Sequence, residues 1–192
     1  MNCRALLREF CRWRYYPESH PPDRPPLIVN EKDGSILVWI PPGEFEMGDG
    51  KDRTCPKHQV FLDGYYLGVH CITNRQYQHF VKDTGHRPPD TSDLSGDRPV
   101  WRRRSYPAAY AEHPVVCVSY EDASAYAKWM SQRTGEKYRL PTFAEWQLIS
   151  NYRGSGDACR DGKLDCGTEG TVPTNQGAAS PLGLLGVRGN VR

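Results

Sequence analysis

The sequence predicts a loop-rich α+β fold, and three observations lead to that prediction. Eighteen glycines and sixteen prolines in 192 residues indicate many turns and irregular loops. Short strand-like runs fill the first part of the domain, and longer patterns of helical period follow them. A chain of this length fits a single domain with a sizeable core.

Residues 1–34 are expected to form an N-terminal extension that ends in a stiff proline-rich linker, and residues 35–192 the domain itself. The first residues, MNCRALLREFCRWRYY, lack the apolar core of a signal peptide. No apolar run of transmembrane length occurs in the sequence, so no membrane partner is expected. With an odd count of seven cysteines, these features favour a reduced, cytoplasmic protein.

The segment 36–70 carries the strand signals. Residues 36–40, ILVWI, read as a strand, and residues 41–48 are expected to turn and pair back on it with Phe45 and Met47 on one face. Residues 58–62 and 65–70 are expected to form a hairpin around Asp63 and Gly64, since Gly tolerates the positive φ of a tight turn.

A first helix is predicted to follow, from Thr73 as the capping residue to Gly85 as the terminator. Tyr77, Phe80 and Val81 form its inner face.

The segment 113–146 predicts a strand, a helix, a short strand and a second helix. Residues 115–118 read as a strand buried on both faces. Ser119 and Asp122 form a capping box for a helix that ends at Gly135, and Thr142 and Glu145 repeat the box. The apolar stripe of the first of these helices consists of Ala123, Tyr126, Ala127 and Met130.

Four stretches in the same order resemble the signatures of the formylglycine-generating enzyme (sulfatase-modifying) family. They read IPPGEFEMG from Ile40, HCITNRQYQHF from His70, VSYEDASAYAKWM from Val118 and YRLPTFAEWQ from Tyr138. The resemblance covers nearly everything from Ile36 onward and implies the irregular α+β fold related to C-type lectins. Tyr120 and Phe143 replace the family's usual Trp and Glu, at positions that we assign to packing.

The resemblance also implies an activity, the oxygen-dependent oxidation of a sulfatase cysteine to formylglycine. Active members use two copper-binding cysteines, and a thiolate pair suits copper(I) because both are soft. Residues 170–192, which end in GNVR, resemble a further family motif, and the catalytic cysteines of active members lie downstream of it. None of them matches the seven cysteines of this chain, which stand at Cys3, Cys11, Cys55, Cys71, Cys117, Cys159 and Cys166. Copper and a sulfatase-type polypeptide are therefore expected only for a C-terminally complete form, and no catalytic residue is assigned.

Two other interpretations stay open. The domain can be a non-catalytic ligand- or protein-binding module on the same lectin-like scaffold, or an inert fragment. A cysteine pair in the segment after GNVR (residues 189–192) would favour the enzyme, and its absence would favour the other two interpretations. Nucleotide-binding, GxSxG and HExxH motifs are absent, and the six histidines lack the His-x-x-x-His-x-Glu pattern of the iron-dependent relatives.

Calcium is the metal that the resemblance implies. The acidic loop 157–169 supplies hard oxygen ligands, although such loops are usually just solvated. Asp165 and the backbone of Cys166 match the start of one family calcium loop, and the backbones of Gly189 and Val191 match part of a second site. Gly186 stands where the family usually has Asn or Asp.

Other residues receive plainer interpretations. For the WRRRSY run at 101–106, a solvated loop with one buried Trp is favoured over phosphate or RNA binding, and the net charge of +2 gives no reason to expect nucleic acid. Cys117 is expected to be an inert thiol in the core strand. Cys159 and Cys166 could form a disulfide or bind metal.

Overall fold

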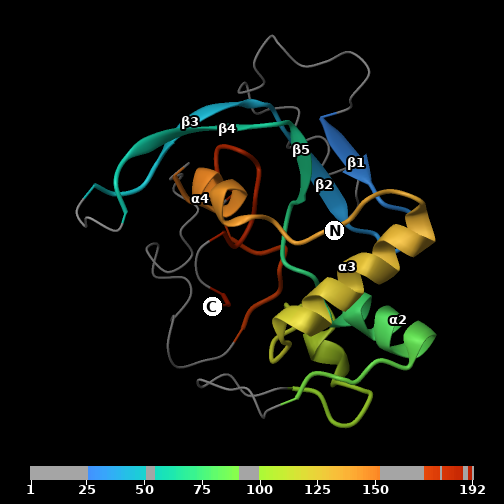
Figure 1. The fold of residues 1–192 in the computed structure, drawn as a ribbon. Coiled ribbons are helices and arrows are strands. Elements are labelled where there is room, and N and C mark those ends of the chain that lie inside the picture. Colours follow the sequence, from blue (N-terminus) through green and yellow to red (C-terminus); the bar gives the residue numbers. More distant parts are fainter. Residues whose placement is uncertain are drawn as a thin grey trace.

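The structure is a computed structural model that describes residues 26–50, 55–90, 100–151, 171–177, 179–187 and 190–191. Strands lie at one end of the molecule together with α4, and α2 and α3 lie side by side at the other end (Figure 1). The segment after residue 170 returns between these two ends (Figure 1).

The larger sheet has the strand order β1-β2-β5 and is antiparallel throughout. Its strands are β1 (Leu27–Val29), β2 (Ile36–Ile40) and β5 (Tyr65–Gly68). Val38 stands opposite Leu27 on one side and Leu67 on the other. Strand β1 falls within the stretch that the sequence assigned to the N-terminal extension, so the sheet begins before residue 35.

The second sheet pairs β3 (Gly43–Met47) with β4 (His58–Leu62). Two predicted pairings are therefore wrong: β3 does not pair back on β2, and β4 and β5 do not form a hairpin with each other. The reason for a glycine at position 64 is also different. Gly64 is not among the left-handed residues, and a Cβ there would lie 2.3 Å from Cζ2 of Trp39, so the glycine admits the indole ring.

All three predicted helices are confirmed, as α2 (Asn74–Thr84), α3 (Tyr120–Thr134) and α4 (Phe143–Asn151). Thr73 and Ser119 cap α2 and α3 with complete capping boxes, which satisfy N–H groups that a helix leaves free. Gly85 and Gly135 end the same helices in the left-handed conformation, as expected.

The predicted strand at 115–118 and the short strand predicted between the last two helices are both absent from the described residues. In the first, Pro114 makes only an isolated bridge with Thr73, and the amide of Val115 donates to the carbonyl of Ile72 at 2.9 Å. Cys117 then adopts φ 63°, which turns the chain out of any ladder. Cys117 is half-buried rather than part of a core strand.

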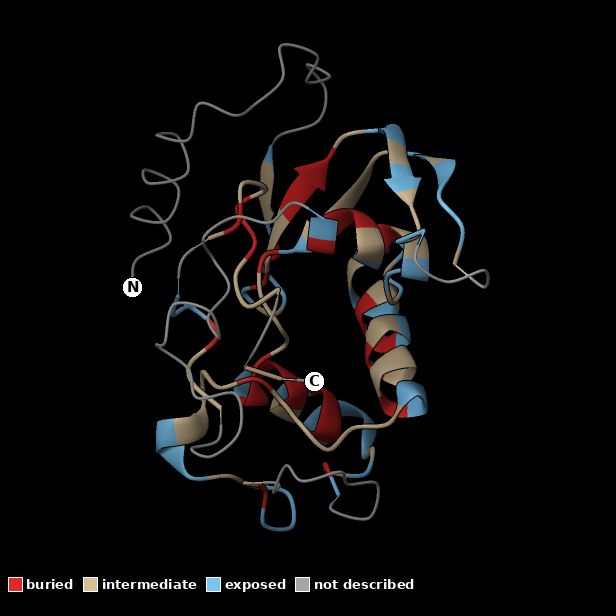
Figure 2. Ribbon diagram, turned by 90° about the vertical axis from the view of Figure 1, so that its left-hand side faces the viewer, coloured by how far each residue is buried: buried red, intermediate tan, exposed pale blue. Residues whose placement is uncertain are grey.

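The described residues form two hydrophobic cores, and Figure 2 shows the buried positions in β2 and along one side of the helices. We call the first the helical core; it consists of Tyr77, Phe80, Val81, Trp101, Tyr126, Trp129 and Met130. We call the second the sheet core; it consists of Val38, Ile40, Val69, Leu148, Ile149 and Leu184.

Two positions assigned to packing from the sequence are instead exposed. Tyr120 is 73% exposed and Phe143 is 70% exposed. Each is the first residue of its helix, directly after the cap, and lies off the stripe that packs inward. The packing prediction for both residues is wrong.

Candidate functional site

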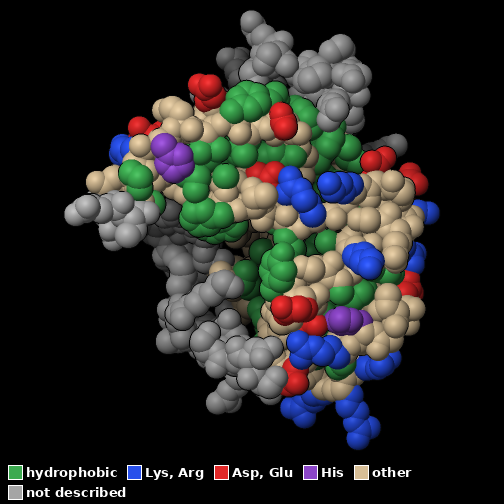
Figure 3. Space-filling model, viewed as in Figure 1, with side chains coloured by type: hydrophobic (Ala, Val, Ile, Leu, Met, Phe, Trp, Pro, Cys, Tyr) green, Lys and Arg blue, Asp and Glu red, His purple; other side chains and the backbone are tan. Residues whose placement is uncertain are grey.

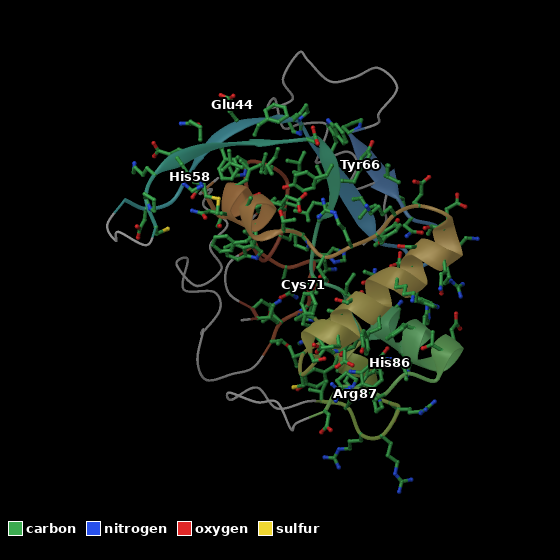
Figure 4. The ribbon with its side chains drawn as sticks, viewed as in Figure 1. Glu44, His58, Tyr66, Cys71, His86 and Arg87 are labelled. Atoms are coloured by element: carbon green, nitrogen blue, oxygen red, sulfur yellow. The ribbon has the colours of Figure 1, made fainter. Side chains whose placement is uncertain are left out.

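The seam between the two cores brings together four stretches that are far apart in the sequence. They are residues 69–73, 112–115, 171–174 and the described residues 184–187 and 190–191. The amide of Leu185 donates to the carbonyl of Val69 at 2.7 Å, and that of Thr174 to the carbonyl of Glu112 at 2.8 Å. Cys71 lies at this seam, between the sheet and the helices (Figure 4).

Cys71 is placed as a protonated thiol. Burial raises the pKa of this thiol above its ordinary value, so at neutral pH it is not the thiolate that acts as nucleophile or metal ligand. His70 does not serve as its base, because Nδ1 of His70 donates to the carbonyl oxygen of Cys71 at 2.9 Å. This hydrogen bond uses Nδ1 of His70 on the backbone of Cys71 rather than on its thiol.

His113 is a second imidazole at the seam, besides that of His70. Burial lowers its pKa, because the charged ring is less well solvated than the neutral one. Its Nδ1 lies 3.0 Å from Oγ1 of Thr171, and its ring contacts that of Tyr110 at 4.8 Å between centroids. No sequence motif pointed to His113 and Thr171, since their contact joins residues distant in the chain.

Asn190 fixes the end of the last described segment. Its side chain accepts from the amide of Val172 at 2.8 Å and donates to the carbonyl of Val172 at 3.0 Å. Its backbone is left-handed, with φ 66°, which Asn tolerates better than most residues. The amide group is thus engaged with backbone and holds the segment 171–174 in place.

The predicted calcium ligands fall mostly where the structure says nothing. Asp165, Cys166 and Gly189 lie outside the described residues. Val191 is described and is half-buried, next to Asn190. Gly186 has φ 63° with no atom within 4 Å of a Cβ built on it, so its conformation suits glycine and leaves room for a small side chain.

Asp122 joins the ends of α2 and α3. It accepts from Nε2 of His86 at 2.8 Å and from Nε and Nη2 of Arg87 at 3.0 and 2.6 Å (Figure 4). Burial would raise the pKa of Asp122, but hydrogen bonds from the Ser119 backbone, His86 and Arg87 outweigh it and lower the pKa to about 2.

Glu145 caps α4 and pairs with an arginine, as Asp122 does at α3. Two hydrogen bonds from Arg139, at 2.7 and 2.6 Å, lower the pKa of Glu145 to about 2, helped by the backbone and side chain of Thr142. A carboxyl group with this pKa stays ionised at neutral pH and cannot donate a proton as a general acid. Asp122 and Glu145 are therefore positioned as structural anions that cap helices.

Within the parts of the chain that the structure describes, no three His, Cys, Asp or Glu side chains come together as a metal-binding group. No helix among the described residues is both long and apolar enough to cross a lipid bilayer.

Residues 27–192 match the family described as the Sulfatase-modifying factor enzyme 1-like domain. The chain therefore belongs to the formylglycine-generating enzyme family, as its motifs indicate.

Among curated relatives, the "Serine/threonine-protein kinase pkn1" of Chlamydia caviae is 29% identical over 97% of this chain but only 31% of its own length. The "Formylglycine-generating enzyme" of Streptomyces coelicolor is 33% identical over 59% of this chain and 46% of its own. That of Thermomonospora curvata is 29% identical over 81% of this chain and 69% of its own. The chain thus spans about a third of the length of the kinase-named relative.

Two solved structures show the same fold. PvdO from Pseudomonas aeruginosa superposes with a TM-score of 0.59 and 23% identity, over 85% of this chain and 71% of PvdO. Treponema denticola variable protein 1 superposes with a TM-score of 0.65 and 15% identity, over 90% of this chain and 75% of that one. At these identities the likeness concerns the fold, and it confirms the loop-rich α+β fold of the formylglycine-generating type.

Proposed function

We propose that this chain is the fold-forming part of a formylglycine-generating-type domain that binds a polypeptide, and that its own cysteines do not carry out the oxidation. The family match over residues 27–192 carries the first part of this proposal. Relatives named formylglycine-generating enzymes align with 59 to 81% of the chain, which makes a sulfatase-type polypeptide the substrate class to test.

The surroundings of two of the three described cysteines, Cys71 and Cys117, support the second part. A copper(I) site of the family's type needs two thiolates. Cys71 is held as a thiol by burial. Cys117 is half-buried and comes two residues after Val115, whose amide donates to the carbonyl of Ile72. The backbone of Cys117 itself is left-handed. The family resemblance matches neither residue to the catalytic pair.

The test is an oxidation assay on a cysteine-containing sulfatase-type peptide, with copper and oxygen, read by the peptide's mass. Purified residues 1–192 are expected to leave the peptide unchanged, while the Streptomyces coelicolor enzyme serves as the positive control. Turnover by this chain that a copper chelator abolishes would refute the proposal.

A non-catalytic binding module is the second candidate. It is favoured by the kinase-named Chlamydia caviae relative, because this region makes up 31% of a larger protein there. One further relative, from Bos taurus, is named "Inactive C-alpha-formylglycine-generating enzyme 2". Calorimetry separates the two candidates: a substrate site should prefer the cysteine peptide over its serine analogue, whereas a binding module of another specificity should bind neither.

We also propose two structural calcium ions, one bound by Asp165 and the backbone oxygen of Cys166, the other bound in part by the backbone oxygens of Gly189 and Val191. A carboxylate and backbone carbonyls are the hard donors that calcium prefers. A ligand of the native state raises the melting temperature, so millimolar calcium is expected to raise it and Asp165→Ala, which removes a ligand of the first site, to reduce the rise. Gly186→Asn adds an oxygen beside the second site, where the backbone is left-handed and the space is open, and is expected to enlarge the rise. A melting temperature indifferent to calcium in all three proteins would contradict both sites.

A further inference from the structure

The turn between Trp101 and Tyr106 presents consecutive arginines at the surface. The amide of Arg102 donates to the carbonyl of Ser105 at 2.8 Å, and the amide of Ser105 donates back at 3.3 Å. Arg103 and Arg104 are thus the two central residues of a tight turn. Residues 102 to 105 are all exposed.

The base of this turn is fixed to the helical core. Trp101 is 6% exposed, and its Nε1 donates to Oδ1 of Asn74 at 2.6 Å. Tyr106 packs on Trp101 with 5.0 Å between ring centroids. Nη2 of Arg104 donates to the carbonyl of Gly85 at 3.1 Å. The arginines are therefore carried by an anchored loop, which lowers the entropy lost on binding.

Lys and Arg side chains gather over α2 and α3 at this end of the molecule (Figure 3). Three of those arginines have carboxylate partners, in the pairs Arg75–Glu112, Arg87–Asp122 and Arg133–Asp83. Within the described part of the chain, neither Arg102 nor Arg103 has an ion-pair partner. Their guanidinium groups remain available to an outside anion.

The backbone of Arg103 gives a second, independent observation. Its φ of 59° lies in the left-handed region, which suits Gly at the first central position of a turn and strains other residues. An arginine at such a position costs stability that glycine would spare. A strained residue with an exposed functional side chain is a reason to infer that the side chain is used.

We propose that the Arg102–Arg103–Arg104 turn is a docking site for an acidic polypeptide segment. Guanidinium groups pair with carboxylates through two parallel hydrogen bonds, which suits Asp and Glu side chains. Nucleic acid fits less well, because single strands need exposed aromatic rings for base stacking. The aromatics flanking this turn, Trp101 and Tyr106, are instead packed on each other at the helical core. The inference does not depend on whether the domain is catalytic.

The test uses a fluorescein-labelled decamer of glutamate as the probe and anisotropy in low salt. The double variant Arg102→Ala, Arg103→Gly is expected to weaken binding by about tenfold or more, since it removes two charge-assisted contacts. Lys128→Ala removes an exposed cation from α3 and serves as the matched control, with affinity unchanged within about twofold.

Arg103→Gly alone sharpens the test, because strain and function predict opposite effects. It is expected to raise the melting temperature by relieving the left-handed residue, and at the same time to weaken peptide binding. Equal peptide affinity in the double variant and the wild type would overturn the proposal, as would a lower melting temperature in Arg103→Gly. A labelled decamer of uridine that binds more tightly than the peptide would also overturn it, in favour of nucleic acid.

Discussion

The helical core and the sheet core are built in different ways. In the helical core, the centroid of the Phe80 ring lies 5.3 Å from that of Tyr77, 5.6 Å from that of Trp129 and 5.7 Å from that of Tyr126. Two capped helices carry all four residues. The sheet core is aliphatic and gathers Val38 from β2, Leu148 from α4 and Leu184 from the last segment. The first core thus rests on helices defined by nearby residues, and the second on contacts between distant parts of the chain.

This difference has a consequence for stability. A helix with its own cap and terminator needs little from the rest of the chain to choose its ends. A sheet assembled from separated strands depends on each close approach being sterically possible. Substitutions in the helical core should therefore act through lost packing, and substitutions in the sheet region through blocked contacts.

The largest effect is expected from Phe80→Ala. Phe80 is 2% exposed and contacts four other aromatic rings, those of Tyr77, Tyr126, Trp129 and His86. Its removal leaves a cavity that should cost about 3–5 kcal/mol of unfolding free energy. Urea unfolding followed by Trp fluorescence measures this. Phe61→Ala in β4, where the ring is 61% exposed, is the control and should change stability by no more than about 0.5 kcal/mol. Similar costs for the two variants would show that the helical core is not the packed centre described here.

A loss of stability of intermediate size is expected at low pH. It comes from two carboxylates, Asp122 on α3 and Glu145 on α4. Asp122 and Glu145 have folded pKa values of about 2, against ordinary values of 3.8 and 4.5. The stability that each contributes is present above its ordinary pKa and is lost as pH falls from there to about 2. Each carboxylate is expected to contribute about 2–3 kcal/mol at neutral pH.

Acid titration of the unfolding free energy tests this. Asp122→Asn and Glu145→Gln should each be less stable at neutral pH and show a shallower loss of stability in acid. Glu44→Gln is the control, because Glu44 is exposed on β3 and extends outward (Figure 4). A double variant with the acid profile of the wild type would contradict the role assigned to both carboxylates.

The smallest of the three effects is expected in the sheet region, from Gly64→Ala. The added Cβ would lie 2.3 Å from the Trp39 ring and must displace it, which should cost about 1–3 kcal/mol. Gly43→Ala is the matched control, since nothing lies within 4 Å of a Cβ there. A neutral Gly64→Ala, or a stabilising Gly64→Asn, would instead favour the tight hairpin turn that the sequence suggested.

The same contrast explains what could be predicted from the sequence. Thr73, Ser119, Gly85 and Gly135 define helix ends through residues within one turn, and all four were identified correctly. The pairing of β3 with β4 and of β5 with β2 was missed, because strand patterns do not name their partners. The pair Asp63–Gly64 matches a hairpin turn. The sequence alone does not distinguish a glycine needed for such a turn from one needed for the close approach of the distant Trp39 ring.

Single residues were missed for related reasons. The run 115–118 has strand-like composition, yet the left-handed Cys117 ends it, and nothing in the composition signals that backbone. Tyr120 and Phe143 are apolar enough to suggest packing, but the first residue of each helix is turned to solvent. At the seam, His113 and Thr171 meet only because the chain returns there after residue 170. The buried Trp101 was anticipated, and the structure confirms it.

We propose above a formylglycine-generating-type domain whose own cysteines are not the catalytic copper pair. The most direct test is a copper(I) titration of residues 1–192 against a chromophoric chelator under reducing conditions. We expect no copper(I) binding strong enough to compete with the chelator, and no change in Cys71→Ser. Stoichiometric copper(I) capture that two Cys→Ser substitutions within the chain abolish would contradict the account and place a thiolate pair in this chain.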